Sequence, residues 1–176
     1  LGGLGHMGVK LAAAMGAHVV MITTSPNKAA DAKKLGAKEV LISKDEQDMA
    51  KHANSFDLII DTIPTKHDLN PYVALLKRDK TLVIVGPLDP VGVHGAPLIM
   101  KRKSISGSVI GGIKETQEML DFCAEHNITS EIAQKDVVLL FGELSVWRVG
   151  NVFKAFCMQV FHDGGSTNIQ LFRCAC

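Results

Sequence analysis

The chain has 176 residues, 47% apolar and 21% charged, and its 19 basic and 18 acidic residues leave a net charge of +1. This composition excludes whole-chain disorder, and the charge balance argues against a nucleic-acid-binding or membrane-binding surface. No window approaches the roughly 18 apolar residues of a membrane span, and no signal peptide is visible, so we expect a cytoplasmic protein. The cysteines and histidines show no metal-ligand spacing, and we predict no metal site.

The pattern of elements begins with a helix over residues 5–15, which Gly16 ends. A β-branched run at 17–25 predicts a buried strand, and helices then alternate with strands. Helices are expected at 26–36, 44–53 and 67–79, and strands at 38–43, 55–63 and 80–87. After a loop rich in Pro and Gly, a strand at 103–110 precedes an amphipathic helix at 114–126. This alternation predicts an α/β fold with a doubly wound parallel sheet.

The composition changes after about residue 133. The stretch from 134 onward holds five of the seven Phe, the only Trp and three of the four Cys, with few charges and no clean alternation of strands and helices. We therefore expect a nucleotide-binding domain over residues 1–133 and a divergent tail over 134–176.

Glycines at the start of the chain match most of a dinucleotide-binding turn. Gly2 and Gly5 fit the second and third positions of G-x-G-x-x-G, where one lets the backbone approach a pyrophosphate and the other permits close packing of helix on strand. A tight turn without a ligand would use the same glycines, so the motif alone does not decide between the two. Because the first glycine and its preceding strand are not in the sequence, we expect the chain to start inside a domain and its sheet to lack the first strand.

The end of the next predicted strand bears on the choice of cofactor. An NAD-binding fold presents Asp or Glu there to hold the ribose 2′-hydroxyl, whereas this sequence has Thr23, Thr24 and Ser25, with Lys28 three positions further. Hydroxyls can donate to phosphate oxygens and a lysine supplies positive charge, so the pattern favours the 2′-phosphate of NADP(H). Ser25 before Pro26 would equally suit a helix cap.

Three further strand ends are expected to lie along the same crevice, because ligands bind beyond the carboxyl ends of strands in an open parallel sheet. Each of them could also be an ordinary strand ending. They are the tripeptides Asp61-Thr62-Ile63, Val85-Gly86-Pro87 and Ser108-Val109-Ile110.

Over residues 1 to 133 the chain resembles the cofactor domain of zinc-dependent medium-chain alcohol dehydrogenases, in the cinnamyl-alcohol-dehydrogenase-like branch that includes NADP-dependent aldehyde reductases. The resemblance rests on LGGLGHMGVKLAAAMGAHV, TTSPNK, FDLIIDTIP, LLKRDKTLVIVG and especially GSVIGGIKETQEMLDFCAEH. It implies a Rossmann-type domain that binds NADP(H). The implied contacts are Leu1, Gly2, Gly3, Leu4 and Gly5 on the pyrophosphate, Thr23, Thr24, Ser25 and Lys28 around the 2′-phosphate, and Thr62, Gly86, Ser108, Val109 and Ile110 along the nicotinamide half.

The resemblance also implies a reaction, the reversible transfer of hydride between NADPH and a small aldehyde, with the alcohol oxygen on a catalytic zinc. The zinc ligands of that family belong to an N-terminal domain that this sequence does not contain, so we expect the chain alone to be inactive, with no catalytic residues of its own. The family often forms homodimers through this domain, so the resemblance makes a homodimer possible here. We attribute the altered tail to a shifted reading frame. The alternative hypothesis is a non-catalytic nucleotide-binding or interaction module.

Overall fold

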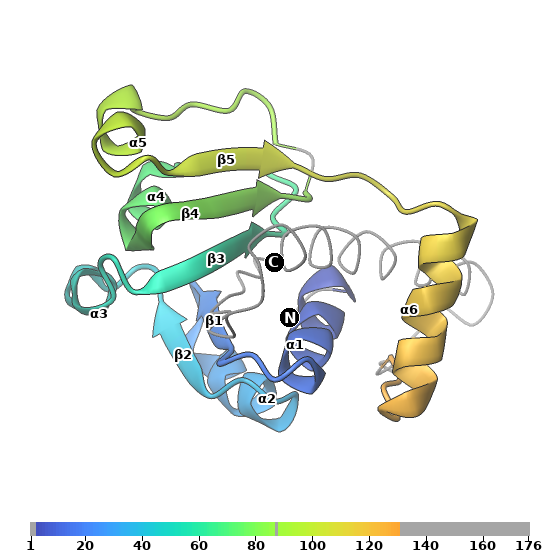
Figure 1. Ribbon diagram of the computed structural model, residues 1–176. Coiled ribbons are helices and arrows are strands. Elements are labelled where there is room, and N and C mark those ends of the chain that lie inside the picture. Colours follow the sequence, from blue (N-terminus) through green and yellow to red (C-terminus); the bar gives the residue numbers. More distant parts are fainter. Residues whose placement is uncertain (1–2, 87, 131–176) are drawn as a thin grey trace.

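A computed structural model of the chain describes residues 3–86 and 88–130 (Figure 1). Its helices are α1 (Gly3–Ala14), α2 (Ala29–Lys34), α3 (Glu46–Lys51), α4 (Asn70–Leu75), α5 (Gly95–Lys101) and α6 (Ile113–Glu125), with a short 3-10 helix, η1, at Pro26–Lys28. Its strands are β1 (Val20–Thr23), β2 (Glu39–Ile42), β3 (Phe56–Asp61), β4 (Leu76–Ile84) and β5 (Ser104–Gly107). Leu1, Gly2, Pro87 and the tail expected over 134–176 lie outside the described residues.

The described strands pair in parallel in two groups. One group is β1 with β2, and the other runs in the order β3-β4-β5. Within the described residues no strand lies between β1 and β3. In a doubly wound sheet, the first strand occupies this place. The α/β class with parallel strands and flanking helices is therefore confirmed, and the described sheet has the gap that the sequence predicts.

The main hydrophobic core lies between the strands and the helices that follow them. All four residues of β1 and five of the six in β3 are buried, as expected for strands covered on both faces. Val9 and Ala12 of α1 belong to the same cluster as Ile22 of β1 and Ile59 of β3. The β-branched runs thus form strands because both of their faces are removed from water.

Helix α6 packs against α1 through a separate apolar cluster. Met7 and Leu11 of α1 contact Met119 and Cys123 of α6, and these four residues are buried. Lys10 of α1 also donates from Nζ to the carbonyl of Thr129 at 2.8 Å. In Figure 1, α6 stands beyond α1, at the end of the extended segment that leaves β5.

The boundary between α4 and β4 differs from the sequence prediction. A helix was expected over 67–79, but α4 ends at Leu75 and the strand starts at Leu76, which pairs with Phe56 of β3. Leu76 and Phe56 are both fully buried, so the apolar contact outweighs the helix propensity of this segment. Asp79 then adopts a φ of 61°, which a helix does not allow.

The segment between β4 and β5 contains a helix where only a loop was expected. Helix α5 has seven residues, GAPLIMK, and ends at Arg102 in a left-handed conformation with a φ of 48°. It is too short for the apolar periodicity of a helix to show clearly in the sequence. Leu98 packs against the main core, which holds α5 beside β4.

Candidate functional site

The first turn of α1 follows directly from the glycine-rich start of the chain. Helix α1 begins at Gly3, has no acidic residue in its first turn and buries Gly5. In Figure 1 this end of α1 lies on the side to which the arrowheads of β3 and β4 point. Unpaired N–H groups at a helix N-terminus attract anions, so the start of α1 suits a phosphate group.

The end of β1 carries hydroxyl groups and one lysine. Thr23 is buried, and its Oγ1 accepts a hydrogen bond from the Ser25 backbone N–H at 3.2 Å, so this hydroxyl shapes the turn itself. Ser25 precedes η1 at the N-cap position, but its side chain makes no capping hydrogen bond. Thr24, Ser25 and Lys28 are each half-buried at this turn. A helix cap therefore explains the position of the Ser25 backbone, but it gives no role to the Ser25 hydroxyl group.

Strand register brings the other three predicted strand ends together. Asp61, Ile84 and Gly107 are cross-strand neighbours at the carboxyl ends of β3, β4 and β5. The residues that follow them leave the sheet side by side, because the Val85 N–H donates to the Asp61 carbonyl at 2.9 Å and the Ser108 N–H to the Ile84 carbonyl at 3.1 Å. The strand ends of the predicted nicotinamide side therefore form one continuous edge.

Gly86 lies where the ends of β3 and β4 approach most closely. A β-carbon at this position would be 2.4 Å from the Ile63 carbonyl oxygen, which is closer than atoms can pack. The Gly86 N–H also donates to the Asp61 carbonyl at 3.2 Å. The glycine is needed here for contact between two parts of the protein, irrespective of any ligand.

Beyond β5, Ser108 presents a polar atom without a partner. Its Oγ is inaccessible to solvent and makes no hydrogen bond within the described residues. Buried hydroxyls normally have a partner, and this one lies at the edge where a ligand is predicted. The following Val109 is 68% exposed and Ile110 37% exposed, so an apolar surface adjoins the serine.

A buried contact between an aspartate and a histidine at this edge was not predicted from the sequence. His67 Nε2 lies 2.7 Å from Asp61 Oδ2, and the two side chains are only 11% and 3% exposed. Asp61 Oδ1 meanwhile accepts a hydrogen bond from the Ile63 N–H at 3.0 Å. The sequence did contain one indication of this contact. An acidic residue ends an apolar strand, and a carboxylate that is buried there requires a partner.

Glu39, Lys103 and Cys123 are among the ionisable groups elsewhere in the described residues whose pKa values are displaced. His18 lies 2.7 Å from Glu39 and its hydrogen bond lowers the pKa of that carboxyl. Burial lowers the pKa of Lys103, whose Nζ donates to the Val73 carbonyl at 2.6 Å. Burial likewise raises the pKa of the Cys123 thiol.

The described part of the chain has neither a metal-binding cluster nor a membrane-spanning helix. Residues 3–86 and 88–130 contain no group of three or more His, Cys, Asp or Glu side chains that could hold a metal ion. A zinc ion does not fit these residues. No helix in the same ranges is both long and apolar enough to cross a bilayer.

Comparisons with known proteins agree with this geometry. Aldehyde reductase YahK from Escherichia coli (strain K12) is 56% identical over 136 residues, which are 75% of this chain and 38% of that protein. A cinnamyl alcohol dehydrogenase structure from Sorghum bicolor matches with a TM-score of 0.74 and 38% identity, over 85% of this chain and 42% of that one. A structure of CAD from Helicobacter pylori complexed with NADP(H) matches with a TM-score of 0.61 and 39% identity, over 71% of this chain and 36% of that one.

The chain thus spans less than half the length of these relatives. The family model for zinc-binding dehydrogenases matches residues 3–125, from the start of α1 to the end of α6. The chain therefore belongs to the zinc-binding dehydrogenase family.

Proposed function

We propose that the chain is the NADP(H)-binding part of an oxidoreductase that interconverts alcohols and aldehydes. In this proposal, residues 1–133 form the cofactor domain. The observation that carries it is the turn after β1, where hydroxyls and Lys28 stand in place of the acidic residue that a free ribose 2′-hydroxyl would require. The aldehyde reductase and cinnamyl alcohol dehydrogenase relatives support the class of reaction.

The proposed contacts follow the elements of the site. The start of α1 would hold the pyrophosphate, and Thr24, Ser25 and Lys28 would surround the 2′-phosphate. The edge formed by Thr62, Gly86 and Ser108 would carry the nicotinamide half. The Oγ of Ser108 has no hydrogen-bond partner in the part of the chain that the structure describes, and this supports the assignment because a bound ligand could supply one. When bound, NADPH would supply the hydride for the reaction.

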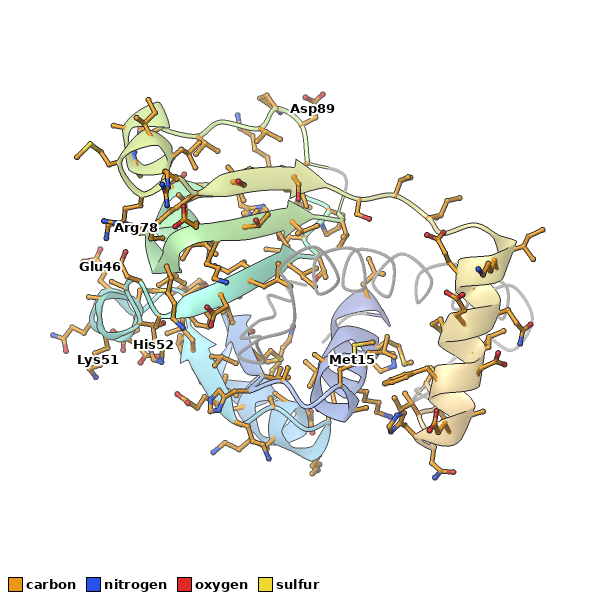
Figure 2. The ribbon with its side chains drawn as sticks, viewed as in Figure 1. Met15, Glu46, Lys51, His52, Arg78 and Asp89 are labelled. Atoms are coloured by element: carbon orange, nitrogen blue, oxygen red, sulfur yellow. The ribbon has the colours of Figure 1, made fainter. Side chains whose placement is uncertain are left out.

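Titration with NADPH and NADH tests this function. The wild-type chain should prefer NADPH, and Lys28→Ala should weaken NADPH binding about tenfold, the effect of one lost charge-assisted contact, while NADH binding stays unchanged. Lys51→Ala removes the same charge from α3, where Figure 2 shows the lysine at the left edge of the molecule, away from α1, and should leave both affinities unchanged. Equal binding of NADPH and NADH by the wild-type chain would contradict the proposal.

We expect no aldehyde-dependent oxidation of NADPH by this chain alone. The reason is that the described residues offer no cluster that could hold a zinc ion to polarise the carbonyl group. Turnover in the presence of added zinc would contradict this expectation. Cofactor binding without turnover would agree with the cofactor domain of an oxidoreductase and also with a non-catalytic nucleotide-binding module. Aldehyde-dependent oxidation of NADPH by a protein that joins this chain to a zinc-binding catalytic domain would distinguish the two.

We also propose that the chain can form a homodimer through the edge of the sheet at β5. Ile99 and Met100 of neighbouring α5 are each 78% exposed, which is unusual for large apolar side chains. A second copy could cover them while pairing with the outer edge of β5. Light scattering on the wild type and on Ile99→Asp tests this. A wild-type monomer at high concentration would contradict it.

A further inference from the structure

The pair formed by Asp61 and His67 lies under the edge that is proposed to carry the nicotinamide half. Asp61 is the last residue of β3, and His67 lies in the loop that leads to α4. Between them the chain moves away from the protein, because Pro64, Thr65 and Lys66 are exposed. It returns at His67, whose ring meets the Asp61 carboxylate. The pair therefore closes this loop onto the end of the strand.

The hydrogen bond of Nδ1 turns the other ring nitrogen of His67 toward Asp61. His67 Nδ1 lies 2.7 Å from the Thr65 carbonyl oxygen, which can only accept, so Nδ1 must carry a hydrogen. Nε2 then faces Asp61 Oδ2 at 2.7 Å, but the two groups are not aligned as a hydrogen bond, and neither atom has a hydrogen-bond partner among the described residues. The contact is therefore a close approach of the imidazole ring to the carboxylate, within ion-pair distance.

Asp61 connects this pair to the residues of the crevice. Its Oδ1 accepts from the Ile63 N–H, and its carbonyl accepts from the N–H groups of Val85 and Gly86. Thr62 lies between the two anchored residues and is buried. The position of the Thr62 backbone is therefore determined by Asp61 on one side and by the close contact of Ile63 with Gly86 on the other.

The ring of His67 is held in place from its other side. Tyr72 of α4 is buried and meets it edge to face, with ring centroids 6.2 Å apart and planes at 74°. The imidazole thus has defined contacts with β3, with its own loop and with α4. A side chain fixed in this way can transmit its position to the carboxylate that it contacts.

We propose that His67 is a positioning residue for the nicotinamide half of the dinucleotide, acting through Asp61 to hold Thr62 and Gly86 in place. The inference rests on the NADP(H) function proposed above. His67 itself touches no ligand in this arrangement. Its loss would remove the side chain that faces the Asp61 carboxylate, and the loop from 62 to 67 would no longer be closed onto the strand.

The affinities for two ligands distinguish this positioning role from a general effect of His67 on folding. NADPH contains both halves of the dinucleotide, whereas adenosine 2′,5′-bisphosphate contains only the adenosine and 2′-phosphate part. His67→Ala should weaken NADPH binding about tenfold or more, because Thr62 and Gly86 would no longer be held in place, and leave binding of the bisphosphate unchanged. Equal weakening of both ligands, or of neither, would overturn the inference.

Two further variants serve as controls. His18→Ala removes a histidine–carboxylate pair of the same 2.7 Å length, but this pair is exposed and lies before β1, at the amino end of the strands, so both affinities should stay unchanged. Asp61→Asn should retain most NADPH binding, because its amide can donate to Nε2 of a neutral His67 while Nδ1 still donates to Thr65. Loss of NADPH binding in Asp61→Asn as large as in His67→Ala would contradict the proposed geometry.

Hydrogen exchange of the wild-type chain gives a test that needs no variant. NADPH should slow exchange of the amides from Thr62 to His67, including the Ile63 N–H, and the bisphosphate should not. No difference between the two ligands would overturn the inference. A wild-type chain that binds neither compound would overturn the NADP(H) function itself, and this inference with it, whereas binding of both with equal losses in His67→Ala overturns the inference alone.

Discussion

Replacing Gly86 with Ala adds one methyl group at the point where the ends of β3 and β4 come closest. The added carbon would lie 2.4 Å from the Ile63 carbonyl oxygen, 2.6 Å from its carbonyl carbon and 3.0 Å from its nitrogen. Ordinary contact begins near 3.4 Å, so the two segments must separate by about 1 Å. All three neighbours are backbone atoms, and no side-chain rotation can relieve the clash.

The cost of this separation can be worked from the contacts that oppose it. The N–H groups of Val85 and Gly86 both donate to the Asp61 carbonyl, at 2.9 and 3.2 Å, and would be stretched or broken. Overpacking of about 1–3 kcal/mol, together with two hydrogen bonds of about 0.5–1.5 kcal/mol each, gives a loss of about 2–6 kcal/mol. This is a large part of the stability of an ordinary domain.

Urea unfolding followed by circular dichroism measures this loss. With a slope of about 2 kcal/mol per molar urea, Gly86→Ala should lower the unfolding midpoint by about 1–3 M. Gly107→Ala is the matched control, because a β-carbon at Gly107 in β5 meets no atom within 4 Å and should change stability by less than about 0.5 kcal/mol. Similar midpoints for the two variants would refute the close approach of Gly86 to Ile63, and with it the crevice geometry.

Three further predictions concern parts of the fold away from this contact. Asp45→Ala should destabilise the chain by about 0.5–2 kcal/mol in urea unfolding, since the Asp45 carboxylate caps α3 by accepting from two backbone N–H groups at 3.0 and 3.1 Å; unchanged stability would contradict the cap. Because the pKa of Glu39 is lowered in the folded chain, its ionised carboxylate stabilises the fold above the ordinary pKa of 4.5. This stabilisation is lost as the pH falls through the lower pKa of the folded state. Thermal unfolding between pH 6 and pH 3 should therefore show a smaller acid-induced loss in Glu39→Gln than in the wild type, and the difference should be small because the pair is exposed. Cys123 is buried and its pKa is raised, so iodoacetamide should alkylate it at pH 7 only after urea unfolding, as mass spectrometry of its peptide would show.

Most of the helices and strands could be predicted from local sequence. Gly16 and Gly36 adopt φ values of 82° and 111°, as expected for glycines that end helices, and the apolar β-branched runs form the strands. These signals are local because a cap or an alternating pattern depends only on residues a few positions apart. They also support the predicted order of elements and the α/β class.

The elements that were mispredicted depend on distant contacts. Leu76 leaves the predicted helix because it pairs with Phe56, twenty positions earlier in the chain. Helix α5 packs on the core through Leu98, and a seven-residue helix has too few turns to show a pattern. Propensity cannot anticipate these outcomes, since the burial that decides them exists only after the chain has folded.

The sequence by itself determined which chemical groups end each strand: the hydroxyls and Lys28 after β1, and Thr62, Gly86 and Ser108 along the second group of strands. Their roles toward a cofactor remain predictions. Tertiary structure alone decided which of these groups meet, because the register of β3, β4 and β5 aligns Asp61, Ile84 and Gly107. It also turned the Thr23 hydroxyl to the Ser25 N–H and brought His67 to Asp61. The physical reason is that a buried polar group takes whichever partner the folded chain places within reach, and the linear pattern does not specify that partner.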